Sequence, residues 1–216
     1  MKKHTIISPI TLVVTGMILA AARAGASPSI TAVTPIFGQV IAVSYPSQFR
    51  VANEETKGNY YLQESVKASE TVDQWSEMIT LTGRKGAASL PQASAKGFVL
   101  NIFKDFQTAC PATFSILELG PRNLDGREGF AAIGSCGNVS TAEEASKNAA
   151  HSETALILGV KGSTDIYTIQ WAERGQPSNR PLTLDAGVWA DRFKQLEPIH
   201  VCEHGPNEVQ SCAARK

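Results

Sequence analysis

The sequence lacks the short motifs that identify many enzymes and cofactor-binding proteins. None of its 17 glycines lies in a G-x-G-x-x-G or G-x-x-x-x-G-K-[ST] phosphate-binding pattern, and the G-x-S-x-G elbow of many hydrolases is missing. The four cysteines form no C-x-x-C pair, so neither a thioredoxin-like redox site nor a zinc ribbon is supported. We therefore expect no cofactor and no metal.

An excess of charge of one sign is also missing, since 20 Lys and Arg residues balance 20 Asp and Glu residues. With 43% hydrophobic residues, this composition excludes a disordered or polyelectrolyte chain. Nucleic-acid binders usually carry a basic patch. The one local basic cluster, Arg84-Lys85, is typical of a solvated turn at a helix end, and we expect no nucleic-acid partner.

The N-terminus has the order of a secretory signal. Two lysines precede an apolar run over residues 6–22, which Ser8 and Pro9 interrupt, and small residues follow up to Ala26. We predict a cleaved signal peptide over residues 1–26, a periplasmic or secreted protein, and no stable membrane span after cleavage. Loss of Lys2, Lys3 and Arg23 from the 20 basic residues leaves 17 against 20 acidic ones, a formal net charge of −3.

All four cysteines follow the predicted signal, so an oxidising compartment favours disulfides. Three connectivities are possible. We favour Cys110–Cys136 and Cys202–Cys212, because each pair is close in sequence and is separated by turn residues. The chain-entropy model gives about 3 to 4 kcal/mol for the first loop and about 3 kcal/mol for the second.

Hydrophobic patterns in the first half predict an extended lead-in, a hairpin and two helices. Residues 27–37 form the lead-in, and strands 40–45 and 60–66 pair across a mobile polar connection, residues 53–59. Thr71 with Gln74 resembles a capping box and predicts a helix that ends at Gly83. Ser89 with Gln92 begins a second helix, in which Phe98, Ile102, Phe103 and Phe106 line one face.

The hydrophobic pattern in the second half of the chain predicts an antiparallel meander. Residues 113–119, 127–135, 153–161 and 166–174 are strand-like, and turn-forming residues follow the first and the third of these runs. The Ala-rich stretch within residues 137–152 has little apolar surface to bury, so it could be a mobile flap. Asp185 caps a last helix that Pro198 closes. We assign residues 38–216 to a single α+β domain with an antiparallel sheet flanked by helices.

This order of elements, with the sequence Gly58-Asn59-Tyr60-Tyr61 in a strand and residues 70–75 opening a helix, resembles the PsbP/Mog1-like family over residues 40–196. The closing helix around Trp189 and Phe193 fits the same pattern. The resemblance implies an antiparallel sheet between helical layers and an accessory role in binding, assembly or chaperoning, without catalysis. The two predicted disulfides are a difference from the better-known members of this family, so the resemblance does not identify a specific partner.

The candidate binding residues are Tyr167, Trp171, Glu173 and Arg174. Tyr167 and Trp171 lie on the same side of their predicted strand. If helices leave that face open, it could hold a protein or a small apolar ligand, with Glu173 and Arg174 at the rim. Burial of both rings in the core is the alternative.

Two other functions remain open. A small secreted hydrolase could use His151 as the base for a serine, if the fold adds a carboxylate. A metal-binding protein could use His200 and His204, although Cys202 supplies no thiolate once it is in a disulfide. The sequence favours the exported, non-enzymatic binding protein.

Overall fold

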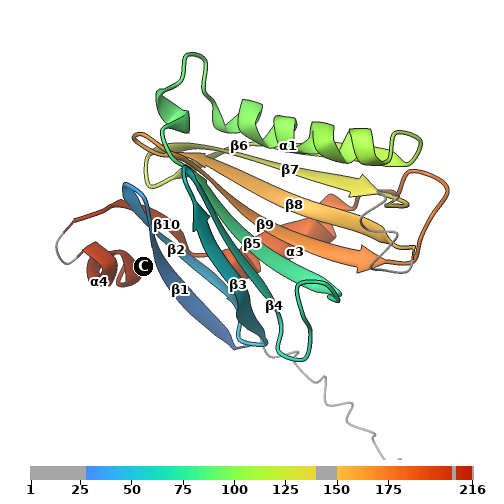
Figure 1. Cartoon of the computed structure of the whole chain (residues 1–216), viewed down its shortest axis with the longest axis horizontal. Coiled ribbons are helices and arrows are strands. Elements are labelled where there is room, and N and C mark those ends of the chain that lie inside the picture. Colours follow the sequence, from blue (N-terminus) through green and yellow to red (C-terminus); the bar gives the residue numbers. More distant parts are fainter. Residues whose placement is uncertain (1–27, 140–149, 206–207, 216) are drawn as a thin grey trace, which may run out of the picture.

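The computed structural model describes residues 28–139, 150–205 and 208–215. It has a three-stranded and a seven-stranded sheet, both antiparallel, with helices packed against them (Figure 1). The predicted class, α+β with an antiparallel sheet flanked by helices, is confirmed.

The small sheet has the strand order β1-β2-β10. Strands β1 (Ser29–Ile36) and β2 (Gln39–Pro46) form a hairpin, so the extended lead-in belongs to a sheet. Strand β10 (Ile199–Glu203) completes this sheet, although the sequence analysis predicted no strand after Pro198. Its residues Val201 and Cys202 pair with Ile41 and Val40 of β2 and are almost fully buried.

The large sheet has the order β3-β4-β5-β9-β8-β7-β6. The predicted meander is confirmed: β6, β7, β8 and β9 follow one another as antiparallel neighbours. Strand β5 then pairs with β9 and joins the β3-β4 hairpin to the meander. The strands are β3 (Phe49–Lys57), β4 (Tyr60–Lys67), β5 (Glu77–Arg84), β6 (Phe114–Leu124), β7 (Arg127–Cys136), β8 (Ser152–Lys161) and β9 (Ile166–Gly175).

The helix predicted before Gly83 is wrong, because that segment contains β5. The predicted capping contact does form, but it closes a turn and starts no helix. The Gln74 backbone N–H donates to Thr71 Oγ1 over 3.1 Å. Beyond the turn, Ile79 and Leu81 are buried against the small sheet, and the ladders to β4 and β9 satisfy the backbone. The pairing of β5 with a strand on each side therefore determines its structure, although its apolar residues are spaced as in a helix.

The predicted mobile connection over residues 53–59 is also wrong, because most of it belongs to β3. This is an edge strand with a bulge between Val51 and Asn53. Its polar composition, with Glu54, Glu55 and Lys57, reflects exposure to solvent at an edge.

The described part of the chain contains four helical segments: η1 (Ala87–Ser89), α1 (Ala95–Ala109), α3 (Ala186–Leu196) and α4 (Glu208–Ala213). Helix α1 begins later than predicted, since its cap is Ser94, whose Oγ accepts from the Gly97 N–H. Asp185 caps α3 as predicted. Both favoured disulfides, Cys110–Cys136 and Cys202–Cys212, are confirmed.

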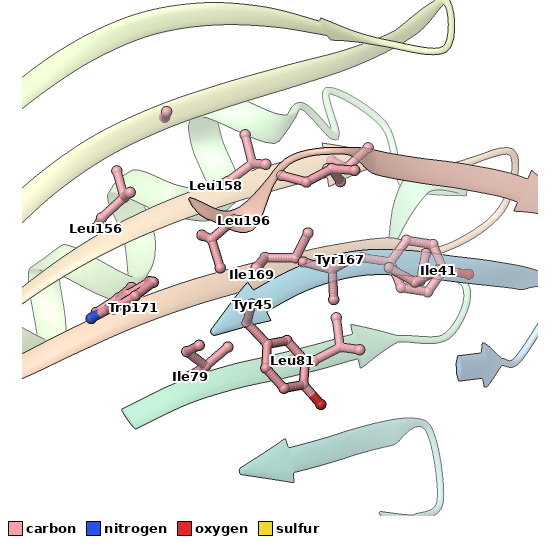
Figure 2. Close-up of a cluster of buried hydrophobic side chains, with 14 of the residues drawn as sticks. Ile41, Tyr45, Ile79, Leu81, Leu156, Leu158, Tyr167, Ile169, Trp171 and Leu196 are labelled. Atoms are coloured by element: carbon pink, nitrogen blue, oxygen red, sulfur yellow. The ribbon is translucent and has the colours of Figure 1, made fainter. Parts of the chain in front are cut away.

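The core lies on both faces of the large sheet. On one face, α1 packs over β7 and β8 through Val99 and Phe103 (Figure 1). On the other, the small sheet and α3 enclose a cluster that includes Ile41, Tyr167 and Leu196 (Figure 2). Helix α4 covers the outer face of the small sheet, where Cys212 packs near Val40.

Candidate functional site

Tyr167 and Trp171 do lie on one face of β9, but that face is the main core (Figure 2). Neither ring is more than 1% exposed. The Tyr167 hydroxyl donates to the Ile36 carbonyl or Asp165 Oδ2, both at 3.1 Å, and Phe49 packs edge-on to Trp171. Burial, followed by the charge of Asp165, raises the pKa of Tyr167.

Glu173 and Arg174 point to opposite faces of the sheet. Glu173 pairs with Arg192 of α3, whereas Arg174 pairs with Glu153 over 3.6 Å and lies 3.9 Å above the ring of Trp75. A binding role for these residues stays a prediction. Because both aromatic rings are covered, we place the candidate surface elsewhere.

The histidines singled out in the sequence are held by separate contacts. His200 Nδ1 is 3.1 Å from Asp125 Oδ2, and His204 Nδ1 is 3.2 Å from the Phe37 carbonyl oxygen. Within residues 28–139, 150–205 and 208–215, no three His, Cys, Asp or Glu side chains form a metal-binding group. His151 is buried at the start of β8 and follows residues 140–149 of the predicted flap, which lie outside the described residues.

Asp165, in the turn before β9, fixes the connection that leads to α1. This carboxylate is 2% exposed and accepts from the backbone N–H groups of Gly38, at 3.1 Å, and Gly86, at 2.7 Å. The neighbouring Thr164 carbonyl accepts from the Ala88 N–H over 2.9 Å. These bonds hold residues 86–88 against the large sheet, beside the start of α1.

An open cavity of about 300 Å³ lies between this anchored connection and the first turns of α1. Its wall includes apolar side chains from the connection, from α1 and from β9, together with three polar side chains, those of Gln92, Ser94 and Asn101. We call it the α1 pocket and define it by Leu90, Pro91, Ser94, Phe98, Asn101 and Ile166. Leu90 is 64% exposed, the largest value among the large hydrophobic residues that the structure describes.

Local features keep this wall in place. Gln92 has φ 62, in the left-handed region that few residues other than glycine adopt, so the chain turns sharply before the Ser94 cap. Lys161 of β8 reaches the same turn, and its Nζ donates to the Ala93 carbonyl over 2.8 Å. Leu90 and Ile166 both line the cavity, and Leu90 is exposed whereas Ile166 is buried.

The sequence analysis missed this site. It placed Ser89 and Gln92 at the start of α1, whereas Ser89 ends η1 and Gln92 lies in the turn between η1 and α1. The available signal was Leu90-Pro91, an apolar pair in a turn-rich stretch before a second N-cap candidate, Ser94. Ile166 is distant in sequence and had no such signal.

No protein-family model matches the chain, and no curated protein sequence matches it. Solved structures with a similar arrangement include a point mutant of Mog1, 13% identical, with a TM-score of 0.41 over 78% of this chain and 86% of that one. The Saccharomyces cerevisiae Ran-binding protein Mog1p is 13% identical, with a TM-score of 0.42 over 79% and 86%. A Bacteroides thetaiotaomicron protein is 11% identical, with a TM-score of 0.36 over 77% and 46%.

The described helices include none that is long and apolar enough to cross a membrane.

Proposed function

We propose that this chain is an exported, non-enzymatic accessory protein that binds a protein partner, and that the α1 pocket receives an apolar side chain of that partner. The observation that carries the proposal is Leu90, which is 64% exposed at the rim of an apolar cavity. Exposed apolar surface rimmed by polar residues is typical of interaction sites.

The size and openness of the cavity favour a partner's side chain over a free small molecule. A volume of about 300 Å³ lies at the lower end for small-molecule pockets, which bury most of their ligand. Leu90, Pro91 and Gln92 are exposed, so one wall faces solvent. Such a recess suits one or two anchoring side chains at the centre of a larger interface.

Export is supported by the predicted signal over residues 1–26 and by the cysteines. All four are paired in disulfides, and such bonds persist in oxidising compartments. No disulfide cysteine lines the α1 pocket, and Cys110 lies at the opposite end of α1 from it.

Photocrosslinking of the full chain in its native cells tests the proposal. One variant carries p-benzoylphenylalanine at Gln92, on the pocket rim, and a matched control carries it at Val188, an exposed apolar residue of α3. We expect a discrete protein adduct from position 92 that disappears when Leu90→Asp is added. Equal adducts from both positions, or an adduct that survives Leu90→Asp, would contradict binding at the pocket.

A further inference from the structure

Strand β1 forms a free edge of the small sheet, because in the described part of the chain it pairs with β2 alone (Figure 1). Its eight residues include no charged side chain, and its pairing with β2 contains no bulge. Natural edge strands usually carry charges or bulges that oppose pairing with a further strand. Apart from Pro35 near its end, β1 lacks these features.

The other sheet edges that the structure describes are protected. Strands β3 and β6, at the edges of the large sheet, each contain a bulge and charged residues. On β10, the opposite edge of the small sheet, the Val201 N–H donates to Asp125 Oδ2 over 3.3 Å, and Arg127 Nε donates to the Val201 carbonyl over 3.1 Å. Side chains of the β6-β7 turn therefore occupy the outward groups of β10, and β1 is the edge that stays open.

The hairpin register shows which backbone groups of β1 point outward. Two residues connect Ile36 to its partner Gln39, so Ile36 and every second residue before it bond to β2. The N–H groups of Ser29, Thr31 and Val33 therefore point away from β2. Within the described residues, none of these three groups has a hydrogen-bond acceptor.

These outward groups are self-complementary. When Thr31 faces Thr31 of an antiparallel second copy, Ser29 faces Val33 at both ends of the pairing. Each of the three pairs exchanges two backbone hydrogen bonds, about six in all. Pro35, which also points outward and has no N–H, lies beyond this register and does not interrupt it.

Ile30 adds an apolar contact to this pairing. It is 43% exposed, although its register partner Tyr45 belongs to the buried core cluster. In the register centred on Thr31, Ile30 faces Ala32 of the second copy with Cβ atoms roughly 5 Å apart, so a large side chain meets a small one. Because β1 is uncharged, the symmetric pairing brings no like charges together.

We propose that the protein forms a two-fold symmetric dimer in which β1 pairs antiparallel with β1 of a second copy. The two three-stranded sheets then join into one continuous sheet, with Thr31 at the axis. A two-fold interface of this kind closes on itself, so it covers both open edges without building a fibre. The dimer goes beyond the proposed function, because no residue of β1 lines the α1 pocket.

Variants of the exported protein that add one cysteine test the register. Under oxidising conditions Thr31→Cys should form a disulfide-linked dimer, because the two residues meet at the axis within disulfide reach. Ser29→Cys is the matched control on the same exposed stretch. Its two copies would be displaced by roughly 13 Å along the strands, too far for a disulfide. Equal crosslinking of the two variants, or crosslinking of Ser29→Cys alone, would overturn this pairing.

Sedimentation equilibrium tests the dimer itself. The disulfide-intact wild type should be dimeric at micromolar concentration, and Thr31→Lys should raise the Kd of dimerisation about tenfold or more, since it places two ammonium groups opposite each other. Thr56→Lys, which adds the same charge to exposed edge strand β3, should change that Kd by less than about twofold. A monomeric wild type, or equal losses from the two variants, would overturn the dimer and leave the proposed function standing, because crosslinking at position 92 does not depend on β1.

Discussion

Gly134 of β7 allows α1 to approach the large sheet closely. A Cβ at this position would lie 2.2 Å from ring atoms of Phe103, the buried aromatic residue on the inner face of the helix. No side chain fits there without moving either the helix or the ring, because protein interiors are close-packed.

We predict that Gly134→Ala lowers the free energy of unfolding by about 1–3 kcal/mol, the usual cost of overpacking a core. Urea denaturation measures this value. In a Phe103→Leu background, the smaller side chain leaves room for the Cβ, so the added cost of Gly134→Ala should be smaller. An equal cost in both backgrounds would show that Phe103 is not the limiting contact.

Glu203 at the end of β10 links the two sheets. A hydrogen bond from Ser163 Oγ, at 2.6 Å, and the contact with Arg127 hold its pKa below the usual value of 4.5. A carboxyl group with a lower pKa in the folded state stabilises the fold above its unfolded pKa. That contribution disappears as the pH falls through the folded pKa.

We therefore predict that Glu203→Gln destabilises the protein at pH 7 and that the difference from the wild type shrinks as the pH falls below 4.5. The side chain is 59% exposed, so the difference at pH 7 should be about 1 kcal/mol or less. Urea unfolding at pH 7 and at acidic pH measures it. A difference that is equal at both pH values contradicts this role of the carboxylate.

At the scale of elements, the sequence predicted those whose pattern is set by a single buried face. Helices α1 and α3 are of this kind. Strands β7, β8 and β9 are buried on both faces and could be predicted instead from long apolar runs between turn residues. Strand β5 is different, because its apolar residues are spaced as in a helix. The segment forms a strand because it pairs with β4 on one side and β9 on the other. Strand β3 is polar because it is an edge, and β10 is too short to show a period.

The α1 pocket could not be predicted for a related reason. Its wall joins the connection after β5 to Ile166, and the link between them is Asp165, which accepts from the Gly86 N–H. A carboxylate that binds backbone N–H groups far away in the chain has no local sequence pattern. Only the pairing of β5 with β9 brings these segments together.

The two disulfides act on different elements, and we predict different costs for their loss. Cys110–Cys136 joins the end of α1 to β7 across 26 residues, whereas Cys202–Cys212 joins β10 to α4 across 10. Replacing the first pair with alanine should cost about 3–4 kcal/mol and replacing the second about 3 kcal/mol, because the longer loop restricts the unfolded chain more. Urea denaturation of each double variant measures this order, and a larger loss from Cys202→Ala/Cys212→Ala would contradict it.

For the whole molecule, the edges of the large sheet are poor docking sites and the α1 pocket is a better one. Both edge strands of the large sheet contain a bulge, β3 between Val51 and Asn53 and β6 between Glu118 and Gly120. Strand β6 also carries Pro121, which has no N–H to donate. Bulges and proline oppose strand addition, so a partner should engage side chains and not an edge of this sheet.

We also predict that the exported protein begins at Ser27. Cleavage there removes the apolar run and leaves β1, which starts at Ser29 and pairs with β2, intact. The intact mass of the protein recovered from the periplasm or the medium, measured before and after thiol labelling, should match residues 27–216 with no reactive thiol. A mass that includes residues 1–26, or labelled cysteines in the folded protein, would contradict export into an oxidising compartment.

The central claim is that a protein partner engages the start of α1. Amide hydrogen exchange of the whole protein, with and without the partner captured from position 92, tests it most directly. We predict slower exchange over residues 87–101 and in β9 near Ile166, with little change in β3, β6 and β10. Slower exchange along an edge strand or the small sheet, with residues 87–101 unchanged, would contradict the account.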